Sequence, residues 1–430
     1  MKSIWNESVN FPEFQALKGD ISAEIVVIGG GICGLLTAYF LKNSGVDCVV
    51  LEANRIANGT TMNTTAKITS QHGLIFADMV KRFGREKTAL YLKANESAIN
   101  NYKQLSKKYP CDFEIKPSFV YSQNDRKKLE NEVLALNKVG FKAEFVENLP
   151  LPVKAVGGVS FKNQAQFNPI KLLNEIVKDL KIYENSRVLK IQNNTAICEN
   201  GIVKAKKIIV TTHFPFIDKY GLYFLKMYQS RSYVLALENA PDFKGMYVDE
   251  NDKGLSFRNY GNVLLLGGYG HRTGKGECGF DALRKFAYKN FADCKIKYRF
   301  ATQDCKTLDD IPYIGYYWGY KDNLLVATGF NKWGMTSSMV AAQILCDMVL
   351  GRENEYAEIF SPSRSIFRKQ LLINCGEAVS GLVGFSKKRC THLGCKLEWN
   401  NQEKSWDCSC HGSRFSNNGE ILDGPANRKK

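Results

Sequence analysis

The sequence predicts an α/β protein of three parts: a doubly wound parallel domain, an antiparallel sheet domain interleaved with it, and a small all-β module near the C-terminal end. Three observations carry this prediction. A glycine-rich βαβ pattern fills residues 24–52, short strands recur between 188 and 300, and four cysteines and two histidines gather between 390 and 411. With 430 residues the chain is also too long for one ordinary core.

The bulk composition is that of a soluble globular protein, with 44% apolar and 24% charged residues. No apolar run reaches about 18 residues, so no membrane span is expected. The N-terminal MKSIWNESVNFPEFQ lacks the apolar core of a secretory signal. We therefore expect a cytoplasmic protein, in which most of the thirteen cysteines are reduced thiols or metal ligands.

The formal net charge of +16 makes anionic partners worth weighing. The basic residues are spread over predicted helix faces, as in KKLENEVLALNK, and only SKKR at 386–389 and the terminal NRKK form short clusters. This spread favours a solvated surface, and no nucleic-acid partner is expected. An acidic redox protein stays open as a partner.

The first element is a complete βαβ unit. EIVVIG, from Glu24, is an apolar run of strand length, and LLTAYFLKNSG has helical periodicity that ends at Gly45. CVVLE then forms a second buried strand and closes with Glu52. Between the first strand and the helix lies G-x-G-x-x-G, so the motif has its full structural context.

Each residue of this motif has a physical purpose. Gly29 permits the tight turn, Gly31 lets a pyrophosphate approach the backbone, and Gly34 lets helix and strand pack closely. The helix N-terminus offers N–H groups and a positive dipole end to the phosphates. Glu52, eighteen residues past Gly34, can accept hydrogen bonds from an adenosine ribose. The pattern predicts a Rossmann-like dinucleotide site rather than an ordinary glycine-rich turn.

The next segment, ANRIANGTTMNTTAKITSQHG, is a polar loop rich in Thr, Gly and Asn. It resembles the second FAD contact in flavoproteins of the D-amino-acid oxidase and glycine oxidase family, where such a loop passes along the ribityl chain and flavin. The resemblance implies FAD rather than NAD, with Thr60, Thr61, Thr65 and Lys67 as contacts. The alternative is a solvent loop.

The middle of the chain returns to this nucleotide site. Residues 85–108 and 125–138 have amphipathic helical patterns, and Asn168-Pro169 starts a third helix. RVLKIQNN, TAICEN and GIVKAKKIIVTT follow as three short strands. By resemblance to the oxidase family, the backbone of Val188 meets the adenine, and KIIVTT rejoins the main sheet.

Further segments continue the resemblance through about residue 355. SRSYVLALE, GLSFRNY and NVLLLGGYG suit an antiparallel sheet over the flavin, the substrate domain of that family. LDDIPYIGYY at 308–317 and the strand-turn-helix pattern at 324–351 resemble the closing segments. Gly329, Gly334, Met335 and Thr336 are then expected at the pyrimidine end of the flavin. A second complete G-x-G-x-x-G unit is missing from the sequence, so we expect electrons from a bound small molecule rather than NAD(P)H.

These patterns divide the chain into three domains. The predicted FAD-binding domain comprises 1–84, 150–220 and 301–360. The predicted substrate domain comprises 85–149 and 221–300. The predicted C-terminal module spans 361–430.

The C-terminal module carries a mixed cysteine–histidine pattern. Cys390-Thr-His392 is followed, after fifteen residues, by Cys408-Ser-Cys410-His411. This C-x-H…C-x-x-H pattern resembles the Rieske family, in which two Cys hold one iron of a [2Fe-2S] cluster and two His hold the other. The predicted ligands are Cys390, His392, Cys408 and His411. Zinc is the alternative metal, although zinc fingers usually pair Cys with Cys and His with His.

The resemblance implies further features of the module. Cys395 and Cys410 stand where Rieske proteins of respiratory complexes form a disulfide between the two ligand loops. The ligand histidines of that family face outward, so His392 and His411 are expected at the electron exit. The module is too small for a robust core of its own and should lean on the flavin domain.

Together the two resemblances predict an FAD-dependent dehydrogenase. A small amine or amino-acid-like substrate would reduce the flavin, and the cluster would pass electrons singly to an external acceptor. His271 and Tyr269 in GGYGHRTGK, and Arg231 through bidentate pairing, are the candidate catalytic or substrate-binding residues, with a structural role as the alternative for each. Two other functions stay open: an oxygen-using amine oxidase, and an electron-transfer flavoprotein without a small substrate.

Overall fold

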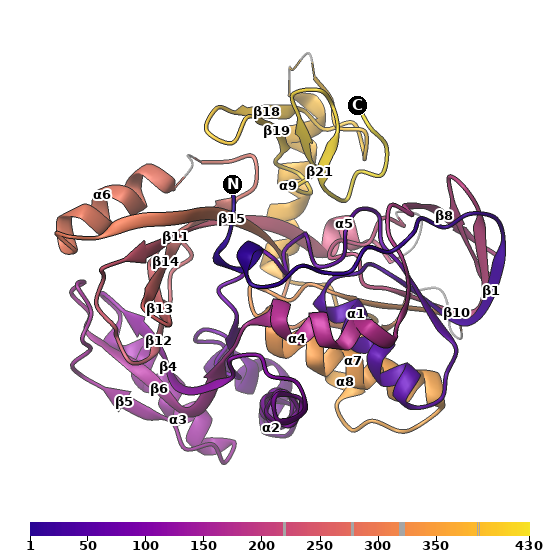
Figure 1. The fold of residues 1–430 in the computed structure, drawn as a ribbon. Coiled ribbons are helices and arrows are strands. Elements are labelled where there is room, and N and C mark those ends of the chain that lie inside the picture. Colours follow the sequence, from indigo (N-terminus) through magenta and orange to yellow (C-terminus); the bar gives the residue numbers. More distant parts are fainter. Residues whose placement is uncertain (218–220, 277–278, 318–322, 385, 387) are drawn as a thin grey trace.

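The chain folds around two large sheets, with a third, small sheet on top of them (Figure 1). The large sheets have eight and nine strands, and the small sheet has four. The α/β class and the all-β sheet of the C-terminal module, both expected from the sequence, are confirmed. This computed structural model describes residues 1–217, 221–276, 279–317, 323–384, 386 and 388–430.

The eight-stranded sheet has the order β16-β17-β10-β1-β2-β7, and β8 and β9 form a hairpin attached to β10. β1 lies parallel to both β10 and β2, and β10 lies parallel to β17. Their buried apolar runs are those of a parallel sheet that is covered on both faces. The strands are β1 (Ile21–Ile28), β2 (Cys48–Leu51), β7 (Lys181–Tyr183), β8 (Val188–Gln192), β9 (Thr195–Cys198), β10 (Ile202–Val210), β16 (Tyr313–Tyr316) and β17 (Leu324–Thr328).

The nine-stranded sheet is mostly antiparallel and has the order β15-β11-β14-β13-β12-β4-β6-β3, with β5 beside β6. Long strands pair at one edge, where β11 lies between β14 and β15. The strands are β3 (Lys67–Ile68), β4 (Glu114–Ser122), β5 (Glu144–Val146), β6 (Gly157–Gln166), β11 (Met227–Glu238), β12 (Met246–Asp249), β13 (Ser256–Tyr260), β14 (Val263–Arg272) and β15 (Lys295–Thr307).

Helices surround the two sheets. α1 begins at the glycine turn and packs against α7, and Asn168 caps α4 with Pro169 in its first turn, as the sequence predicts. The elements are η1 (Ile4–Glu7), α1 (Ile32–Asn43), α2 (Phe76–Lys108), α3 (Arg126–Lys138), α4 (Pro169–Ile176), η2 (Val177–Asp179), α5 (Tyr223–Lys226), α6 (Phe280–Asn290), α7 (Gly334–Leu350) and α8 (Ala357–Phe360).

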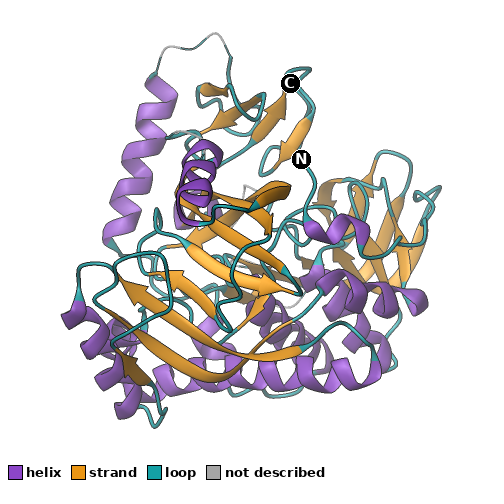
Figure 2. Ribbon diagram, turned by 60° about the vertical axis from the view of Figure 1, so that its left-hand side comes forward, coloured by secondary structure: helices purple, strands orange, loops and turns teal. Residues whose placement is uncertain are grey.

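The C-terminal module combines a helix with the four-stranded sheet. The helix α9 (Lys369–Val383) stands upright beside the sheet in Figure 2. The sheet has the order β18-β19-β20-β21 and is antiparallel throughout. Its strands are β18 (Leu397–Asn400), β19 (Ser405–Cys408), β20 (Arg414–Ser416) and β21 (Ile421–Asp423).

The strand pairing differs from the predicted domain boundaries in three places. β3 and β6 lie in segments predicted for the FAD-binding domain, yet both pair in the nine-stranded sheet. β15 also continues in that sheet beyond residue 300. Which sheet a strand joins depends on the strands beside it in the fold. The sequence of the strand itself does not indicate those neighbours. None of the helices in the described residues is long and apolar enough to cross a membrane.

Candidate cofactor and cluster sites

A cavity of about 850 Å³ opens at the carboxyl ends of the parallel strands. Ile28 at the end of β1, Thr211 after β10 and Ala327 in β17 all line it. Ligands of open α/β sheets bind at this edge. The volume is at the upper end of the roughly 300–1,000 Å³ of small-molecule pockets, which suits a dinucleotide.

The glycine motif takes the shape that its predicted purpose requires. Gly29 has φ +111°, and a Cβ there would lie 2.8 Å from the carbonyl oxygen of Thr211. A Cβ on Gly34 would lie 2.0 Å from the carbonyl oxygen of Gly29, so helix and strand can approach only without a side chain at this position. Gly31 precedes α1 and lines the cavity, whereas Gly34 lies behind the lining.

Glu52 lines the cavity where β2 ends. Its carboxylate accepts hydrogen bonds from the backbone N–H groups of Gly30 at 2.7 Å and Asn54 at 2.8 Å. Burial raises the pKa of Glu52, and these two N–H groups act in the opposite direction. These two bonds fix the Glu52 side chain in the cavity lining, and its contact with a ribose stays a prediction.

The polar loop after Glu52 also lines the cavity, through Thr60, Thr61, Thr65 and Lys67. Thr61 Oγ1 accepts the N–H of Ile32 at 3.0 Å and so caps the first turn of α1. Lys67 Nζ donates to Thr65 Oγ1 at 3.2 Å. Burial, and then the nearby charge of Arg258, lower the pKa of Lys67 to about 7.

The later predicted FAD contacts divide into two groups. Val188, Gly334 and Met335 line the cavity, whereas Gly329 and Thr336 do not. Gly329 has φ +72°, and a Cβ there would lie 2.3 Å from Thr307 Cγ2. Thr336 is buried and donates to the carbonyl oxygen of Thr69 at 3.0 Å. Both residues therefore support the wall from behind.

Two buried polar atoms in the lining fit a bound cofactor. His213 Nε2 and Ser338 Oγ are shielded from solvent, and neither has a hydrogen-bond partner within the described residues. Buried polar groups in native proteins are nearly always hydrogen-bonded, so both atoms are suited to bind a polar ligand. The residues of the cavity thus fit FAD.

His72, which no sequence pattern indicated as a site residue, also lines the cavity. Its ring stacks on Trp333 with a centroid separation of 5.3 Å and hydrogen-bonds Tyr91 and Thr336 at 2.6 and 2.9 Å. Burial lowers its pKa to about 3, so the ring is neutral. In the sequence, SQHG stands at the end of a polar loop. The partners of His72 are distant along the chain, so the residues around it do not indicate its role.

A charged group on the opposite wall was also missed. Lys306 and Lys332 donate to the one carboxylate of Asp252 at 3.3 and 3.2 Å, and all three line the cavity. Burial alone would raise the pKa of Asp252, but the two lysines lower it to about 2. Asp304 and Asp310 also line the cavity near Lys306, and burial raises the pKa of both, which favours their neutral forms.

The three predicted catalytic residues lie elsewhere, and none of them lines the cavity. Tyr269 has φ +54° and packs beside Gly279. His271 Nδ1 donates to the carbonyl of Arg272 at 2.9 Å, and Tyr233 donates to its Nε2 at 3.0 Å. Arg231 binds Glu403 of the C-terminal module. Their positions outside the lining favour the structural alternative, and a catalytic role for each stays a prediction.

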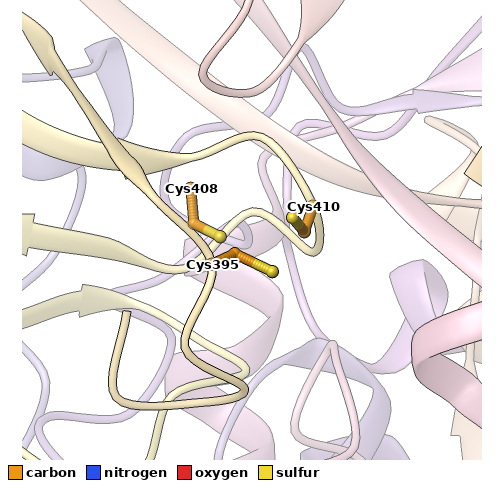
Figure 3. Close-up of side chains that lie close together, drawn as sticks. All are labelled: Cys395, Cys408 and Cys410. Atoms are coloured by element: carbon orange, nitrogen blue, oxygen red, sulfur yellow. The ribbon is translucent and has the colours of Figure 1, made fainter. Parts of the chain in front are cut away.

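The cluster loops meet at the edge of the small sheet. Cys390, Cys395, Cys408 and Cys410 are all at most 4% exposed. The Cys395, Cys408 and Cys410 sulfurs lie within 4.8 Å of one another and converge in Figure 3, and the nearby Cys408 side chain raises the pKa of the Cys390 thiol. β18 pairs Leu397 with Cys408, which holds the two loops together.

The two predicted histidine ligands share this site. Their rings lie 4.9 Å apart at 84°, and the Nδ1 atoms of both are buried. His411 Nδ1 has no hydrogen-bond partner in the described chain. Burial, and then the neighbouring His392, lower the pKa of His411 to about 3, so its ring is the neutral form that binds metal. Paired buried thiols and imidazoles fit a [2Fe-2S] cluster.

Two expectations concern the cluster loops, and the one about histidine orientation needs correction. Cys395 and Cys410 are free thiols in the structure, and the disulfide that the resemblance implies stays a prediction. His392 is partly exposed, but His411 is only 2% exposed and does not face outward. The second loop instead packs against the nine-stranded sheet, and the Phe224 ring lies 6.0 Å from that of His411.

Two buried glutamines bind the second cluster loop to this sheet. Gln229 Nε2 donates to the carbonyl oxygens of His411 and Gly424 at 2.7 and 2.8 Å. Gln303 Nε2 donates to Gly412 O at 2.8 Å and to Gln229 Oε1 at 2.7 Å. Thr60 of the cofactor loop donates to Gln303 O at 3.3 Å, so these contacts join the two cofactor sites.

Further contacts surround this pair. Arg272 donates to the carbonyl oxygens of Ser409 and Cys410, each at 2.9 Å. Residues 421–427 reach across to line the cofactor cavity, and Asn427 donates to the carbonyl oxygen of Val188 at 3.1 Å. The module therefore supplies part of the cavity wall.

Comparison with known proteins agrees with both sites. Residues 24–348 match the family described as FAD dependent oxidoreductase, and residues 348–429 match the Rieske [2Fe-2S] domain. The chain is 35% identical to YhfW of Bacillus subtilis (strain 168), named as a Rieske 2Fe-2S iron-sulfur protein, over 99% of this chain and 96% of the relative. A stretch of 37 residues is 51% identical to the cytochrome b6-f complex iron-sulfur subunit of Trichodesmium erythraeum (strain IMS101), covering 9% of this chain and 21% of that protein.

Solved structures show the same fold. Glycine oxidase from Geobacillus kaustophilus has a TM-score of 0.67 at 14% identity, covering 80% of this chain and 99% of that one. L-proline dehydrogenase from P. horikoshii has a TM-score of 0.67 at 18% identity, over 81% and 98%. The chain therefore belongs to the FAD dependent oxidoreductase family, is an enzyme with FAD as cofactor, and carries a Rieske [2Fe-2S] domain in its C-terminal part.

Proposed function

We propose that this enzyme is a dehydrogenase of small amines or amino-acid-like substrates whose electrons leave singly through the cluster to an external acceptor. The observation that carries the proposal is the shared wall between the two sites. Thr60, Gln303 and Gln229 connect the cofactor loop to the second cluster loop, and residues 421–427 line the cofactor cavity.

The electron balance requires both cofactors. Oxidation of an amine to an imine removes two electrons and two protons from the substrate. FAD, when bound, accepts the electron pair as hydride, and a [2Fe-2S] cluster supplies one-electron steps. Each turnover then reduces two one-electron acceptors and releases the protons to solvent.

Two lysines in the cavity wall support a carboxylate-bearing substrate. Lys306 and Lys332 both pair with Asp252, and burial favours the neutral form of the neighbouring Asp304 and Asp310, so the two lysines can also attract a substrate carboxylate. The fold relatives include a glycine oxidase and an L-proline dehydrogenase, whose names designate amino-acid substrates. In this role the two lysines replace Arg231, which Glu403 engages.

The test is an anaerobic screen of amino acids and amines against the holoprotein. A substrate should bleach the flavin absorbance, and the cluster signal should follow in the electron paramagnetic resonance (EPR) spectrum. If only reduced carrier proteins bleach the flavin, the protein is an electron-transfer flavoprotein and the proposal is wrong. Peroxide released in air at the rate of turnover would replace it with an oxidase.

A paired substitution tests the substrate-binding wall. Lys306→Met with Lys332→Met should raise the KM for a carboxylate substrate by at least about tenfold, because one lost charge-assisted hydrogen bond is worth roughly 1.5–3 kcal/mol. Dithionite should still bleach the flavin of this variant. Lys285→Met, at an exposed position on α6, is the matched control. An unchanged KM would remove the wall from substrate binding. The predicted cytoplasmic location stays a prediction.

A further inference from the structure

We infer that the face around His392 is a docking surface for an acidic one-electron carrier protein. The surface, here called the exit face, consists of the solvent side of α9, the tip of the first cluster loop and four cations beside that loop. The inference rests on the proposed function, in which electrons leave through the cluster, and it adds where they leave and what kind of partner receives them.

The first step is the asymmetry of the two histidines. His411 is 2% exposed, and the carbonyl oxygens of its loop accept from Gln229, Gln303 and Arg272 of the enzyme's own sheet. That side of the cluster is closed to a second protein. His392 is partly exposed, and its neighbour Leu393 is 39% exposed. A carrier can thus approach the cluster from the His392 side.

The second step is an unusual apolar face on α9. Leu372, Val379 and Val383 are 75%, 60% and 73% exposed, and their spacing of seven and four residues places them on one side of the helix. Ile373 and Leu382 extend the face and are also exposed. A helix normally turns such a stripe inward, so a contiguous exposed stripe marks an interaction site.

The third step joins this stripe to the cluster. The C-terminal end of α9 lies against the first cluster loop, where Lys396 N donates to Gly381 O at 2.9 Å. Arg389 donates to the carbonyl oxygens of Leu382 at 2.8 Å and Gly394 at 3.3 Å. The apolar stripe and the His392 loop therefore form one continuous surface.

The fourth step is the charge of this surface. Lys388 and Lys430 lie over the ring of Trp406 at 4.2 and 5.9 Å, and the hydroxyl of Thr391 donates to the carbonyl oxygen of Arg428. With Arg389 they form a group of four cations, none of which has an ion pair with a side-chain carboxylate in the described chain. Other lysines of the module do have one, as in Lys396–Glu398 and Lys429–Glu420.

The apolar stripe and the cations of the exit face determine which kind of protein can bind there. An apolar centre with a cationic edge is complementary to a partner with an apolar contact area and an acidic edge. A second copy of this chain would bring the same cations, and each chain has a net charge of +16, so self-association through this face is repulsive. In each encounter the reduced cluster is oxidised by one electron, and the redox centre of the carrier is reduced by the same electron.

The experiment measures how fast the reduced cluster passes an electron to two probes that differ only in charge. The holoprotein is reduced with stoichiometric dithionite, so no substrate is needed and a failed substrate screen does not affect the result. The probes are native cytochrome c, which is basic, and succinylated cytochrome c, in which lysines carry carboxylates. The succinylated probe should react at least about tenfold faster at low salt, and the difference should shrink as salt is added.

The variants place the effect on the exit face. Arg389→Glu with Arg428→Glu should lower the rate with the succinylated probe about tenfold and raise it with the native probe. Arg428→Glu alone is the milder test, because none of its side-chain atoms has a hydrogen bond in the described part of the chain. Lys103→Glu with Lys107→Glu, exposed on α2, is the control with equal charge change. An unchanged cluster EPR spectrum checks that the site is intact.

Three results would overturn the inference. The first is equal rates with both probes, and the second is an equal loss of rate in the control variant. The third is binding of the holoprotein to vesicles of anionic lipid that Arg428→Glu abolishes, because the exit face would then be a membrane contact. Leu382→Ser with Val383→Ser should slow the succinylated probe at high salt, and no effect there would also count against the docking surface.

Discussion

Lys67 lies in the cofactor cavity beside another cation, Arg258, and has no ion pair with a carboxylate among the described residues. Its pKa of about 7 is well below the ordinary 10.5. Between these two values the unfolded chain binds a proton on Lys67 that the folded chain does not. The free energy of unfolding of the flavin-free protein therefore gains a contribution that grows as the pH rises through this interval.

Lys67→Met removes that contribution. Urea unfolding of the flavin-free protein at about pH 7 and about pH 9 should show a smaller gain in stability for the variant than for the wild type. Lys127→Met, at an exposed position on α3, should behave as the wild type does. An equal pH dependence in all three proteins would mean that Lys67 keeps its ordinary pKa.

The iron ligands give a second prediction at this scale. Cys390→Ser should abolish the [2Fe-2S] signal in the EPR spectrum after dithionite and lower the iron content to near zero, because serine replaces a thiolate ligand. Cys375→Ser, in α9, changes a free and only partly buried thiol and should leave both unchanged. A bound zinc ion in the wild-type protein would contradict the ligand assignment.

The prediction of the iron ligands depends on a local signal. The spacing of Cys390, His392, Cys408 and His411 lies within 22 residues, and the structure gathers all four. The prediction of the substrate residues had no such signal. Arg231 looked like a carboxylate binder, but its carboxylate is that of Glu403, 172 residues away in the sequence. The sequence around Arg231 contains no pattern that indicates a partner so far along the chain.

At the scale of elements, the βαβ unit depends on Gly34. A Cβ at this position would lie 2.0 Å from a backbone oxygen that cannot turn away, so Gly34→Ala must force α1 and β1 apart. We expect a loss of about 1–3 kcal/mol in stability and a lower FAD content after purification. Gly376→Ala, in α9, has open space around its Cβ outside the cavity lining and should retain FAD. Full FAD content in Gly34→Ala would contradict this account of the motif.

Element boundaries followed from periodicity where one face was buried. β1, α1 and β2 lie where the apolar runs predict them, and α3 and α4 match their amphipathic patterns. α9 was not predicted. Its segment contains Gly376 and Gly381, which disfavour helix, and its exposed apolar stripe differs from the usual pattern of a surface helix.

At the scale of the whole molecule, Gln229 and Gln303 hold the iron module on the flavin-binding body. Gln229→Leu would leave the carbonyl oxygens of His411 and Gly424 without their donor, which costs roughly 1–3 kcal/mol for each buried group. We expect slower electron transfer from flavin to cluster, with both cofactors still bound. The transfer rate is measured from the absorbance change after photoreduction of the flavin.

The control for this variant lies at the rim of the same interface. Gln402 is exposed and donates to Asp281 at 3.2 Å, so Gln402→Leu should leave the transfer rate unchanged. Equal rates in the two variants would show that the buried glutamines do not position the module. The interface itself could not be predicted, because Gln229 and His411 are 182 residues apart.

Residues 421–427 belong to the iron module and also form one side of the flavin's chamber. Damage to the iron centre, for instance by oxidants, would therefore be felt at the flavin, because a module that has come loose unseals that chamber and admits water. An enzyme molecule that has lost its iron would then also hold its flavin less tightly. In such damaged molecules the flavin would dissociate, and electrons from the substrate would not be transferred to oxygen.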